Sequence, residues 1–209
     1  MIKAILFDLD GTLIDSESYY NKGTKAWITQ EGFAICDEDS YKTIGMTLPE
    51  IYDYLAKLLK VKRDFVVAKT MTYFKNHPLR FEELIFPDVL PCLERIKEMG
   101  LVIGICSISD SEYVKRFVAE CGLEKYVDCC IGGDAVTRQK PYPDIYLKAI
   151  EVLNMEQKDA IVVEDSVSGI KAAKKAGMYC IARDASRFHI DQSEADMIID
   201  DLEKLSEVI

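Results

Sequence analysis

The sequence has little histidine and no apolar run long enough to cross a membrane. Two histidines, at positions 77 and 189, are too few to predict a zinc site. The longest apolar stretches, such as residues 101–106, have the length of a strand, whereas a membrane helix needs about 20 residues. Residues 1–7 lead directly into Asp8 and are too short for a signal peptide. We therefore expect a cytoplasmic protein without a membrane partner.

The sequence also lacks any Cys-x-x-Cys pair. Its seven cysteines are odd in number, and Cys129 and Cys130 are adjacent, which disfavours a disulfide framework. Free thiols are the norm in a reducing compartment, so the cysteines agree with a cytoplasmic location.

Positive charge is scarce overall, since the formal net charge is −10. This disfavours nucleic acid as a partner, because such binding depends on lysine and arginine neutralising phosphates. Residues 16–80 differ from the rest, with 10 lysines and arginines against 8 acids. An acidic body suits a divalent cation, and a slightly basic segment suits an approaching anionic substrate.

Two patterns of apolar residues divide the chain. Between residues 16 and 81, apolar side chains recur at helical spacing, as at Ile51, Tyr54, Leu55 and Leu58, and strand-like runs are missing. This segment predicts a compact helical domain inserted into a larger one.

The remainder, residues 1–15 and 82–209, alternates strands with helices. Such alternation predicts an α/β fold, a doubly wound parallel sheet of the Rossmann-like kind with helices on both faces. The helix after the second strand is expected to begin with a capping box at Ser109-x-x-Glu112. The expected strands are residues 3–7, 101–106, 127–131, 160–163, 178–182 and 197–199.

Four acids and a serine directly follow three of these strands: Asp8, Asp10, Ser107, Glu164 and Asp165. In such sheets ligands bind beyond the carboxyl ends of the strands, so these side chains are expected to gather at one edge. Four acids held close together repel one another, and a divalent cation removes that repulsion. A ligand set made only of oxygen suits Mg²⁺, which we predict as the cofactor.

The spacing of Asp8 and Asp10 suits two roles at one phosphorus atom. Residues i and i+2 of an extended segment point to the same side. Asp8 would attack and form an aspartyl-phosphate, while Asp10 would protonate the leaving oxygen and then activate water. Ser107 precedes a helix start that favours an anion, and Lys140 supplies a positive charge for the phosphoryl oxygens.

Four motifs taken together resemble those of the haloacid dehalogenase superfamily. They are Asp8-Leu9-Asp10-Gly11-Thr12-Leu13, Ser107, Lys140-Pro141-Tyr142-Pro143-Asp144 and Glu164-Asp165-Ser166-x-x-Gly169. The resemblance covers nearly the whole core, and the insertion at residues 16–81 is similar to the C1-type α-helical cap of this family. It implies a phosphoric monoester hydrolase that acts on a small-molecule phosphate ester.

The resemblance also implies roles for single residues. Asp8 would be the nucleophile and Asp10 the general acid and base. The implied phosphate ligands are Ser107, Ile108 and Lys140. The implied metal ligands are the Asp8 carboxylate, the Asp10 backbone carbonyl, Asp165 and, at or just behind the metal, Glu164.

Three functions remain open from the sequence. The namesake dehalogenases lack the second aspartate and the metal-binding acids, so their presence here favours a phosphatase. Isomerases of the β-phosphoglucomutase kind carry a histidine and an arginine where this chain has Tyr20 and Leu48, which favours a phosphatase over a mutase. A non-enzymatic binding protein on the same fold is the third hypothesis.

Three further expectations concern a helix cap, the oligomeric state and contacts with the substrate. Position 110 is an aspartate where some relatives have a basic residue, and we interpret it as a helix cap. We also expect a monomer or a weak homodimer. The predicted substrate contacts in the cap are Tyr19, Tyr20, Lys22, Lys42 and Thr47.

Overall fold

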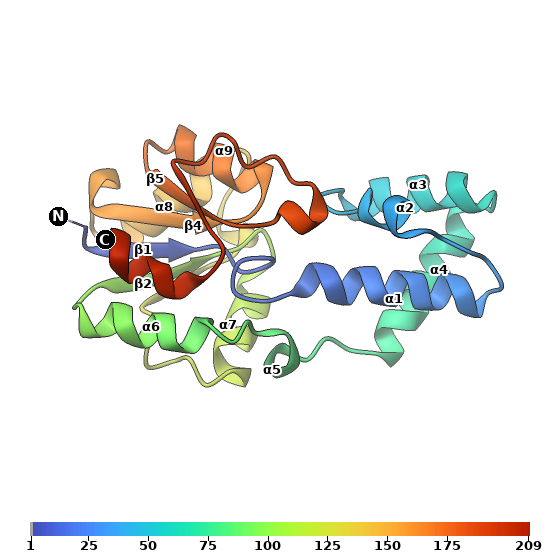
Figure 1. Cartoon of the computed structure of the whole chain (residues 1–209), viewed down its shortest axis with the longest axis horizontal. Coiled ribbons are helices and arrows are strands. Elements are labelled where there is room, and N and C mark those ends of the chain that lie inside the picture. Colours follow the sequence, from blue (N-terminus) through green and yellow to red (C-terminus); the bar gives the residue numbers. More distant parts are fainter. Residues whose placement is uncertain (1) are drawn as a thin grey trace. The chain divides into compact units, whose positions relative to one another are not determined.

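The computed structural model describes residues 2–209, and a six-stranded parallel sheet forms the centre of the unit made of residues 1–15 and 81–209 (Figure 1). The strand order is β3-β2-β1-β4-β5-β6, and each neighbouring pair is parallel. This confirms the predicted α/β, doubly wound fold. The strands are β1 (Ala4–Phe7), β2 (Val102–Cys106), β3 (Cys129–Ile131), β4 (Ala160–Glu164), β5 (Tyr179–Arg183) and β6 (Met197–Ile199).

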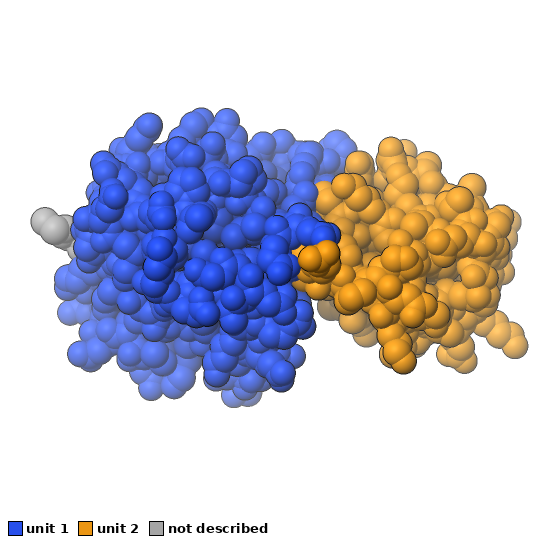
Figure 2. All heavy atoms as spheres, turned by 90° about the horizontal axis from the view of Figure 1, so that it is seen from below, with its two compact units in different colours: residues 1–15, 81–209 blue, residues 16–80 orange. Residues whose placement is uncertain are grey.

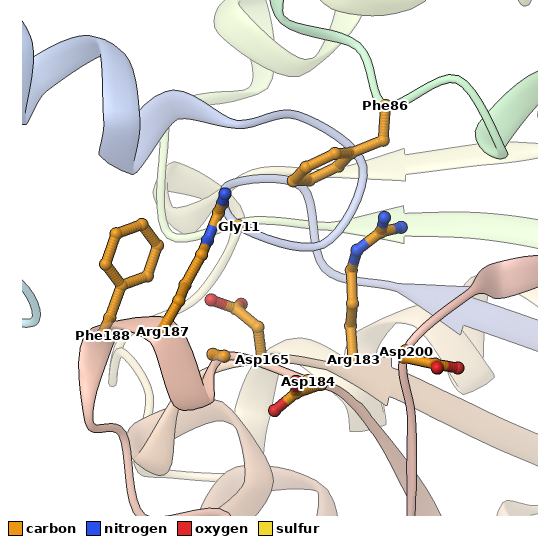
Figure 3. Close-up of a pocket in the computed structure, with 9 residues that line it drawn as sticks. Gly11, Phe86, Asp165, Arg183, Asp184, Arg187, Phe188 and Asp200 are labelled. Carbon is orange, nitrogen blue, oxygen red and sulfur yellow. The ribbon is translucent and has the colours of Figure 1, made fainter.

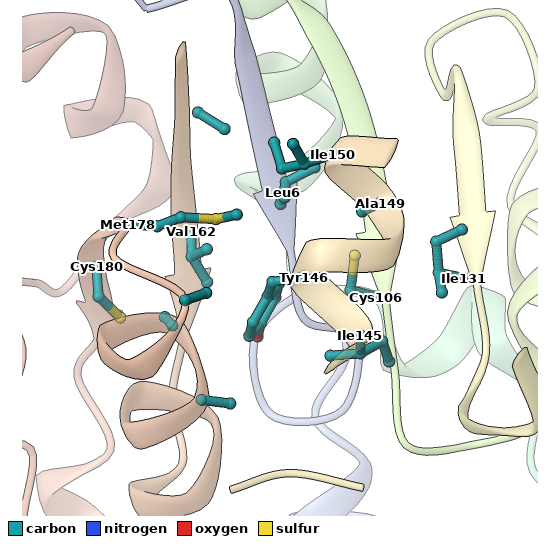
Figure 4. Packing of buried hydrophobic residues seen from close by; sticks show 14 of the residues in the cluster. Leu6, Cys106, Ile131, Ile145, Tyr146, Ala149, Ile150, Val162, Met178 and Cys180 are labelled. Atoms are coloured by element: carbon teal, nitrogen blue, oxygen red, sulfur yellow. The ribbon is translucent and has the colours of Figure 1, made fainter. Parts of the chain in front are cut away.

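Helices cover both faces of the sheet. On one face α8 (Asp144–Leu153) and α9 (Val167–Lys175) pack onto buried side chains of β1 and β4, among them Leu6 and Val162 (Figure 4). Burial from both sides explains why the strands read as continuous apolar runs. The other helices of this part are α5 (Phe81–Leu84), α6 (Val89–Glu98), α7 (Ser111–Glu120) and α10 (Leu205–Val208), with 3-10 turns at Gly133–Ala135, Gln157–Asp159, Ser186–Phe188 and Leu202–Lys204.

The register of β1 with its neighbours determines which residues meet at the carboxyl edge of the sheet. Phe7 lies level with Ile105 of β2 and Val163 of β4. The residues that follow each of these three are Asp8, Cys106 and Glu164. Parallel pairing therefore brings side chains that are far apart in the sequence to one place.

The start of α7 differs from the prediction. Its N-cap is Asp110, whose Oδ1 accepts a hydrogen bond from the backbone N–H of Tyr113 at 2.8 Å. The capping box predicted at Ser109-x-x-Glu112 is therefore wrong, whereas the interpretation of Asp110 as a helix cap is confirmed. A carboxylate accepts from first-turn N–H groups and also interacts favourably with the helix dipole, which explains its advantage over the serine.

Residues 16–80 form a compact unit of their own, separate from the unit of residues 1–15 and 81–209 (Figure 2). The second boundary falls between residues 80 and 81, one residue before the predicted position. The core of the helical unit consists of Trp27, Ile28, Leu55, Leu59 and Val66. Its helices are α1 (Ser16–Gln30), α2 (Asp37–Tyr41), α3 (Leu48–Leu59) and α4 (Arg63–Asn76).

Within residues 2–209, no helix has the length and apolar character that a membrane span requires. The structure contains seven free cysteines, of which Cys92, Cys106, Cys129 and Cys180 are buried.

Candidate active site

The ammonium group of Lys140 lies at the centre of the candidate site. Its Nζ donates to Asp8 Oδ1 at 2.5 Å, to Glu164 Oε1 at 2.6 Å and to the carbonyl of Cys106 at 3.1 Å. The centre of the Tyr146 ring lies 5.0 Å from the same nitrogen. The Lys140 side chain is 2% exposed, so its charge is held away from water between the ends of three strands. A fixed charge of this kind interacts strongly with an anionic group that enters the site.

The charges of this cluster do not balance. Burial raises the pKa of Asp8 well above its ordinary value, although Lys140 opposes this shift. Burial also acts to raise the pKa of Glu164, but Lys140 outweighs it and the pKa is lowered. Burial acts to lower the pKa of Lys140, yet the two carboxylates raise it. Lys140 pairs with both Asp8 and Glu164, so one positive charge faces two carboxylates, and a further cation would balance the cluster.

Both carboxylate oxygens of Glu164 accept more than one hydrogen bond. Besides the lysine, Oε1 accepts from the Tyr146 hydroxyl at 2.9 Å. Oε2 accepts at 3.0 Å from the N–H of Asp165 and from both the N–H and the hydroxyl of Ser166. A Cβ on Gly169 would lie 1.6 Å from Oε1, so only glycine leaves room for the carboxylate. The fourth motif thus holds Glu164 in one orientation.

Asp165 completes a group of three buried acids. Its Oδ1 accepts from the Thr12 hydroxyl at 3.2 Å, and its carbonyl accepts from the Gln192 amide at 2.7 Å. Three carboxylate oxygens lie within 4.8 Å of one another, one each from Asp8, Glu164 and Asp165. Three buried acids exceed the charge of one lysine, and their oxygen atoms suit a hard divalent cation. The residues present therefore fit the predicted metal.

The Asp10 carboxylate has different partners from that of Asp8. Its Oδ2 lies 3.4 Å from the hydroxyl oxygens of Ser107 and Ser109, and its Oδ1 accepts from the Tyr113 hydroxyl at 3.2 Å. Asp10 is half-buried, whereas Asp8 is buried. Two carboxylates with a lysine on one and hydroxyls on the other are suited to different chemical roles.

The loop after β2 presents backbone rather than side chains at its second position. The Ser107 side chain is buried, and its oxygen also accepts from the N–H of Ser109 at 3.1 Å. The Ile108 side chain is 59% exposed and apolar. A phosphate contact at Ile108 would therefore come from its backbone.

A pocket of about 180 Å³ adjoins Asp165, which points into it from the end of β4 (Figure 3). Its two arginines already have partners. Arg183 pairs with Asp88 at 3.0 Å, and its guanidinium lies 3.8 Å from the centre of the Phe86 ring. Arg187 donates to Asp15 at 2.7 Å. These contacts join the end of β5 and the 3-10 turn after it to Asp15, which precedes α1, and to the segment before α6. The lining residues are Gly11, Phe86, Asp165, Arg183, Asp184, Ala185, Arg187, Phe188 and Asp200.

Comparison with known proteins assigns the family. The sequence matches the haloacid dehalogenase-like hydrolases over residues 5–183. The chain belongs to this family. The match confirms the predicted superfamily and enzyme class of this haloacid dehalogenase-like hydrolase.

Three similar proteins illustrate the match. A validoxylamine A 7′-phosphate phosphatase from Streptomyces hygroscopicus subsp. limoneus is 30% identical, with 97% of this chain and 95% of that protein covered. A phosphoglycolate phosphatase from Aquifex aeolicus is 31% identical over 84% of this chain and 82% of its own length. The solved structure of a haloacid dehalogenase-like protein from Agrobacterium tumefaciens matches with a TM-score of 0.81 at 26% identity, covering 100% and 97% of the two chains.

In this haloacid dehalogenase-like hydrolase, Gly11→Ala is expected to lower turnover by about 10²-fold, a loss that a displacement of about 1 Å in a site can cause. Gly11 has a φ of +85°, and a Cβ there would lie 2.1 Å from Asp165 Oδ2, so the carboxylate must move. The matched control is Gly100→Ala. Gly100 also has a positive φ, of +77°, but a Cβ added there would have no atom within 4 Å. Phosphate release at saturating substrate measures both variants, and equal activity would contradict the prediction.

Two of the predicted substrate contacts, Tyr19 and Tyr20, lie on α1 in an aromatic cluster. Each ring centre is 5.4 Å from that of Phe74, and the two tyrosines are 5.0 Å apart. The Tyr19 hydroxyl donates to the carbonyl of His77. Tyr20 is 43% exposed. Tyr19 therefore stabilises the helical unit itself, and a role in substrate binding stays a prediction for both.

The other predicted contacts in this unit are polar and exposed. Lys42 pairs with Asp39 at 2.9 Å. The N–H and hydroxyl of Thr47 donate to the Glu50 carboxylate at 2.8 and 2.7 Å, which stabilises the start of α3. Lys22 is also exposed. Their contact with a substrate likewise stays a prediction.

The structure adds supporting residues that the sequence did not single out. Tyr146 and Gln192 reach the site from α8 and from the loop after β5, and no motif marks either of them. Thr12 belongs to the first motif. Its hydroxyl, four residues after Asp8, was the signal in the sequence that could have identified it as a site residue. Tyr113 lies in the first turn of α7 and was not recognised because its hydroxyl meets Asp10 only in the folded chain.

Proposed function

We propose that this protein is a Mg²⁺-dependent phosphatase that hydrolyses a small phosphorylated metabolite through an aspartyl-phosphate. The observation that carries the proposal is the buried Asp8 carboxylate, held by Lys140 at 2.5 Å, with Asp10 two residues further on. A carboxylate nucleophile, a fixed cation and a second carboxylate with separate partners are the parts that this chemistry needs. The phosphatases among the relatives support the same reaction class.

In the proposed reaction, Asp8 attacks the phosphorus atom of the ester. The bond to the leaving oxygen breaks as the new bond from Asp8 Oδ forms, and Asp10 gives its proton to that oxygen. Asp10 then takes a proton from water as the water oxygen attacks the phosphorus of the aspartyl-phosphate, and the bond between phosphorus and Asp8 breaks. Inorganic phosphate leaves, and both aspartates return to their starting states.

The phosphoryl oxygens are proposed to be bound by Lys140, the Ser107 hydroxyl and the backbone N–H of Ile108. Lys140 is already desolvated, so its field acts on the developing charge at full strength and needs no reorganisation. Asp110 caps α7 rather than contacting phosphate, which leaves Lys140 as the proposed cationic ligand from the protein.

The proposed metal ligands are the Asp8 carboxylate, the Asp10 carbonyl and Asp165. Bound Mg²⁺ would supply positive charge that neutralises the phosphoryl oxygens and the three acids. We place Glu164 just behind the metal, because five donors occupy its two oxygens. Its role is to hold Lys140 and the loop that carries Asp165.

The substrate is proposed to be a sugar phosphate, phosphoglycolate or a nucleotide-type ester. We propose that residues 16–80 act as the cap and supply specificity through Tyr19, Tyr20, Lys42 and Thr47. The expected state is a monomer or weak homodimer in the cytoplasm, without nucleic acid as a partner.

Metal dependence is the first test of the proposed function. Hydrolysis of p-nitrophenyl phosphate is expected to fall to background after exhaustive chelation and to return with Mg²⁺. Ca²⁺ is expected to inhibit, because it binds oxygen ligands with looser geometry. Release of p-nitrophenolate measures each condition. Full activity in the chelated enzyme, or in Ca²⁺ alone, would refute the metal assignment.

A panel of phosphorylated metabolites then distinguishes phosphatase from mutase. Phosphate release from a sugar phosphate or phosphoglycolate supports the proposal. Conversion of a sugar 1-phosphate to its 6-phosphate without net phosphate release would instead indicate the isomerase. Tyr20 and Leu48, in place of the histidine and arginine of such mutases, favour the first outcome.

A further inference from the structure

The carboxylate of Asp10 is held from both of its oxygens. Two serine hydroxyls lie 3.4 Å from Oδ2, while the Tyr113 hydroxyl donates to Oδ1 at 3.2 Å. Donors on both oxygens restrict rotation of the carboxyl group about its χ2 angle, which is otherwise broad for aspartate. The orientation of Asp10 therefore depends on the tyrosine on one side and the serines on the other.

Tyr113 is itself held firmly at both its backbone and its ring. Its N–H donates to the Asp110 carboxylate at 2.8 Å, which fixes it in the first turn of α7. Its ring packs edge-on against Phe81 with 5.0 Å between centres. Phe81 is fully buried and also contacts Phe117 at 5.6 Å. A ring fixed in this way can direct its hydroxyl at one point.

We propose that Tyr113 is a positioning residue for the general acid and base, Asp10. This inference rests on the proposed function, because it requires Asp10 to transfer a proton. The Tyr113 hydroxyl holds Oδ1, so that the proton of Asp10 is presented to the leaving oxygen in one geometry. Asp110 also contributes to this arrangement, because it caps α7 and so anchors the backbone of the tyrosine that orients Asp10.

The inference predicts a dependence on the leaving group. An alkyl alcohol leaves as a strong base and needs a proton in the transition state, whereas p-nitrophenolate is a weak base and needs little help. Loss of the Tyr113 hydroxyl should therefore slow the hydrolysis of alkyl esters more than that of aryl esters. A loss of folded structure or of phosphate binding would slow the hydrolysis of both kinds of ester equally.

The decisive experiment compares Tyr113→Phe with the native enzyme on an alkyl phosphate that it hydrolyses and on p-nitrophenyl phosphate. The parameter is kcat/KM, because it reports on steps up to the first phosphoryl transfer. We expect a fall of about 10- to 100-fold for the alkyl ester and of less than about threefold for the aryl ester. The inhibition constant of inorganic phosphate should stay unchanged. Equal losses for the two esters, or no loss, overturn the inference.

Tyr126→Phe is the matched control. The Tyr126 hydroxyl also donates to a carboxylate, that of Glu94, at 2.5 Å in the same unit, but outside the candidate site. Its removal should leave the ratio of the two kcat/KM values unchanged. In an Asp10→Asn background, Tyr113→Phe should have no further selective effect, because the proton it positions is gone. A selective effect in that background contradicts the inference.

Two outcomes separate this inference from the proposed function. A native enzyme that hydrolyses neither ester overturns both. A native enzyme that hydrolyses both, with a non-selective Tyr113→Phe, overturns only the role of Tyr113. If Tyr113→Phe does not fold, Asp110→Ala tests the same inference. It removes the carboxylate that accepts from the Tyr113 N–H but keeps the tyrosine ring. It should lower kcat/KM for the alkyl ester more than for the aryl ester, by a smaller factor than Tyr113→Phe.

Discussion

Asp8→Asn is expected to reduce turnover by at least about 10⁴-fold, because a carboxamide oxygen cannot replace the attacking carboxylate. The substitution keeps the shape of the side chain and the contact of its oxygen with Lys140. The fold is expected to persist, since Lys140 still pairs with Glu164 at 2.6 Å. Phosphate release in the presence of Mg²⁺ measures the activity, and circular dichroism measures the fold.

Asp159→Asn is the control for this change. Asp159 also pairs with a lysine, Lys3, at 3.0 Å, but it precedes β4 at the opposite edge of the sheet from Asp8. It should retain activity close to that of the native protein. If the folded Asp8→Asn enzyme keeps more than about 1% of native turnover, Asp8 is not the nucleophile.

Lys140→Met is expected to destabilise the protein by about 3–5 kcal/mol, because it leaves two buried carboxylates without their cation. It is also expected to lower turnover by about 10³-fold through loss of the charge on the phosphoryl group. The stability deficit should shrink as the pH falls, since protonation of Asp8 and Glu164 removes the uncompensated charge. Urea unfolding across pH measures the stability.

The control for this variant is Lys148→Met. Lys148 pairs with Glu151 at 3.0 Å on the surface of α8, where such pairs contribute about 0–1 kcal/mol. Mg²⁺ should stabilise Lys140→Met more than the native protein, because the ion then supplies the missing charge. A Lys140→Met protein as stable as Lys148→Met would show that the buried lysine does not balance the acids.

Positions at the carboxyl ends of strands were predictable from the sequence. Continuous apolar runs identified β1, β2 and β4, and parallel pairing brings the ends of neighbouring strands to one edge. Asp8, Ser107 and Glu164 could therefore be expected at one place before any contact was known. The room that Gly169 leaves for the Glu164 carboxylate could not be expected from the strand pattern.

Contacts made by helices and loops were not predictable in the same way. Whether Ser109 or Asp110 caps α7 depends on which side chain reaches the first-turn N–H groups, and both are ordinary capping residues. Tyr146 and Tyr113 reach the site because helix packing rotates one face of α8 and of α7 toward it. Sequence spacing places a residue on a face but does not decide what that face meets.

The sequence by itself determined the fold class and which acids stand at the sheet edge, because strand patterns and the residues that follow them are local properties. Only the tertiary structure decided the partners of those acids. It gave Asp8 a buried lysine and Asp10 three hydroxyl donors, and it surrounded Glu164 with five donors. These partners come from separate segments, and their distances depend on how helices pack on the sheet, which no local pattern encodes.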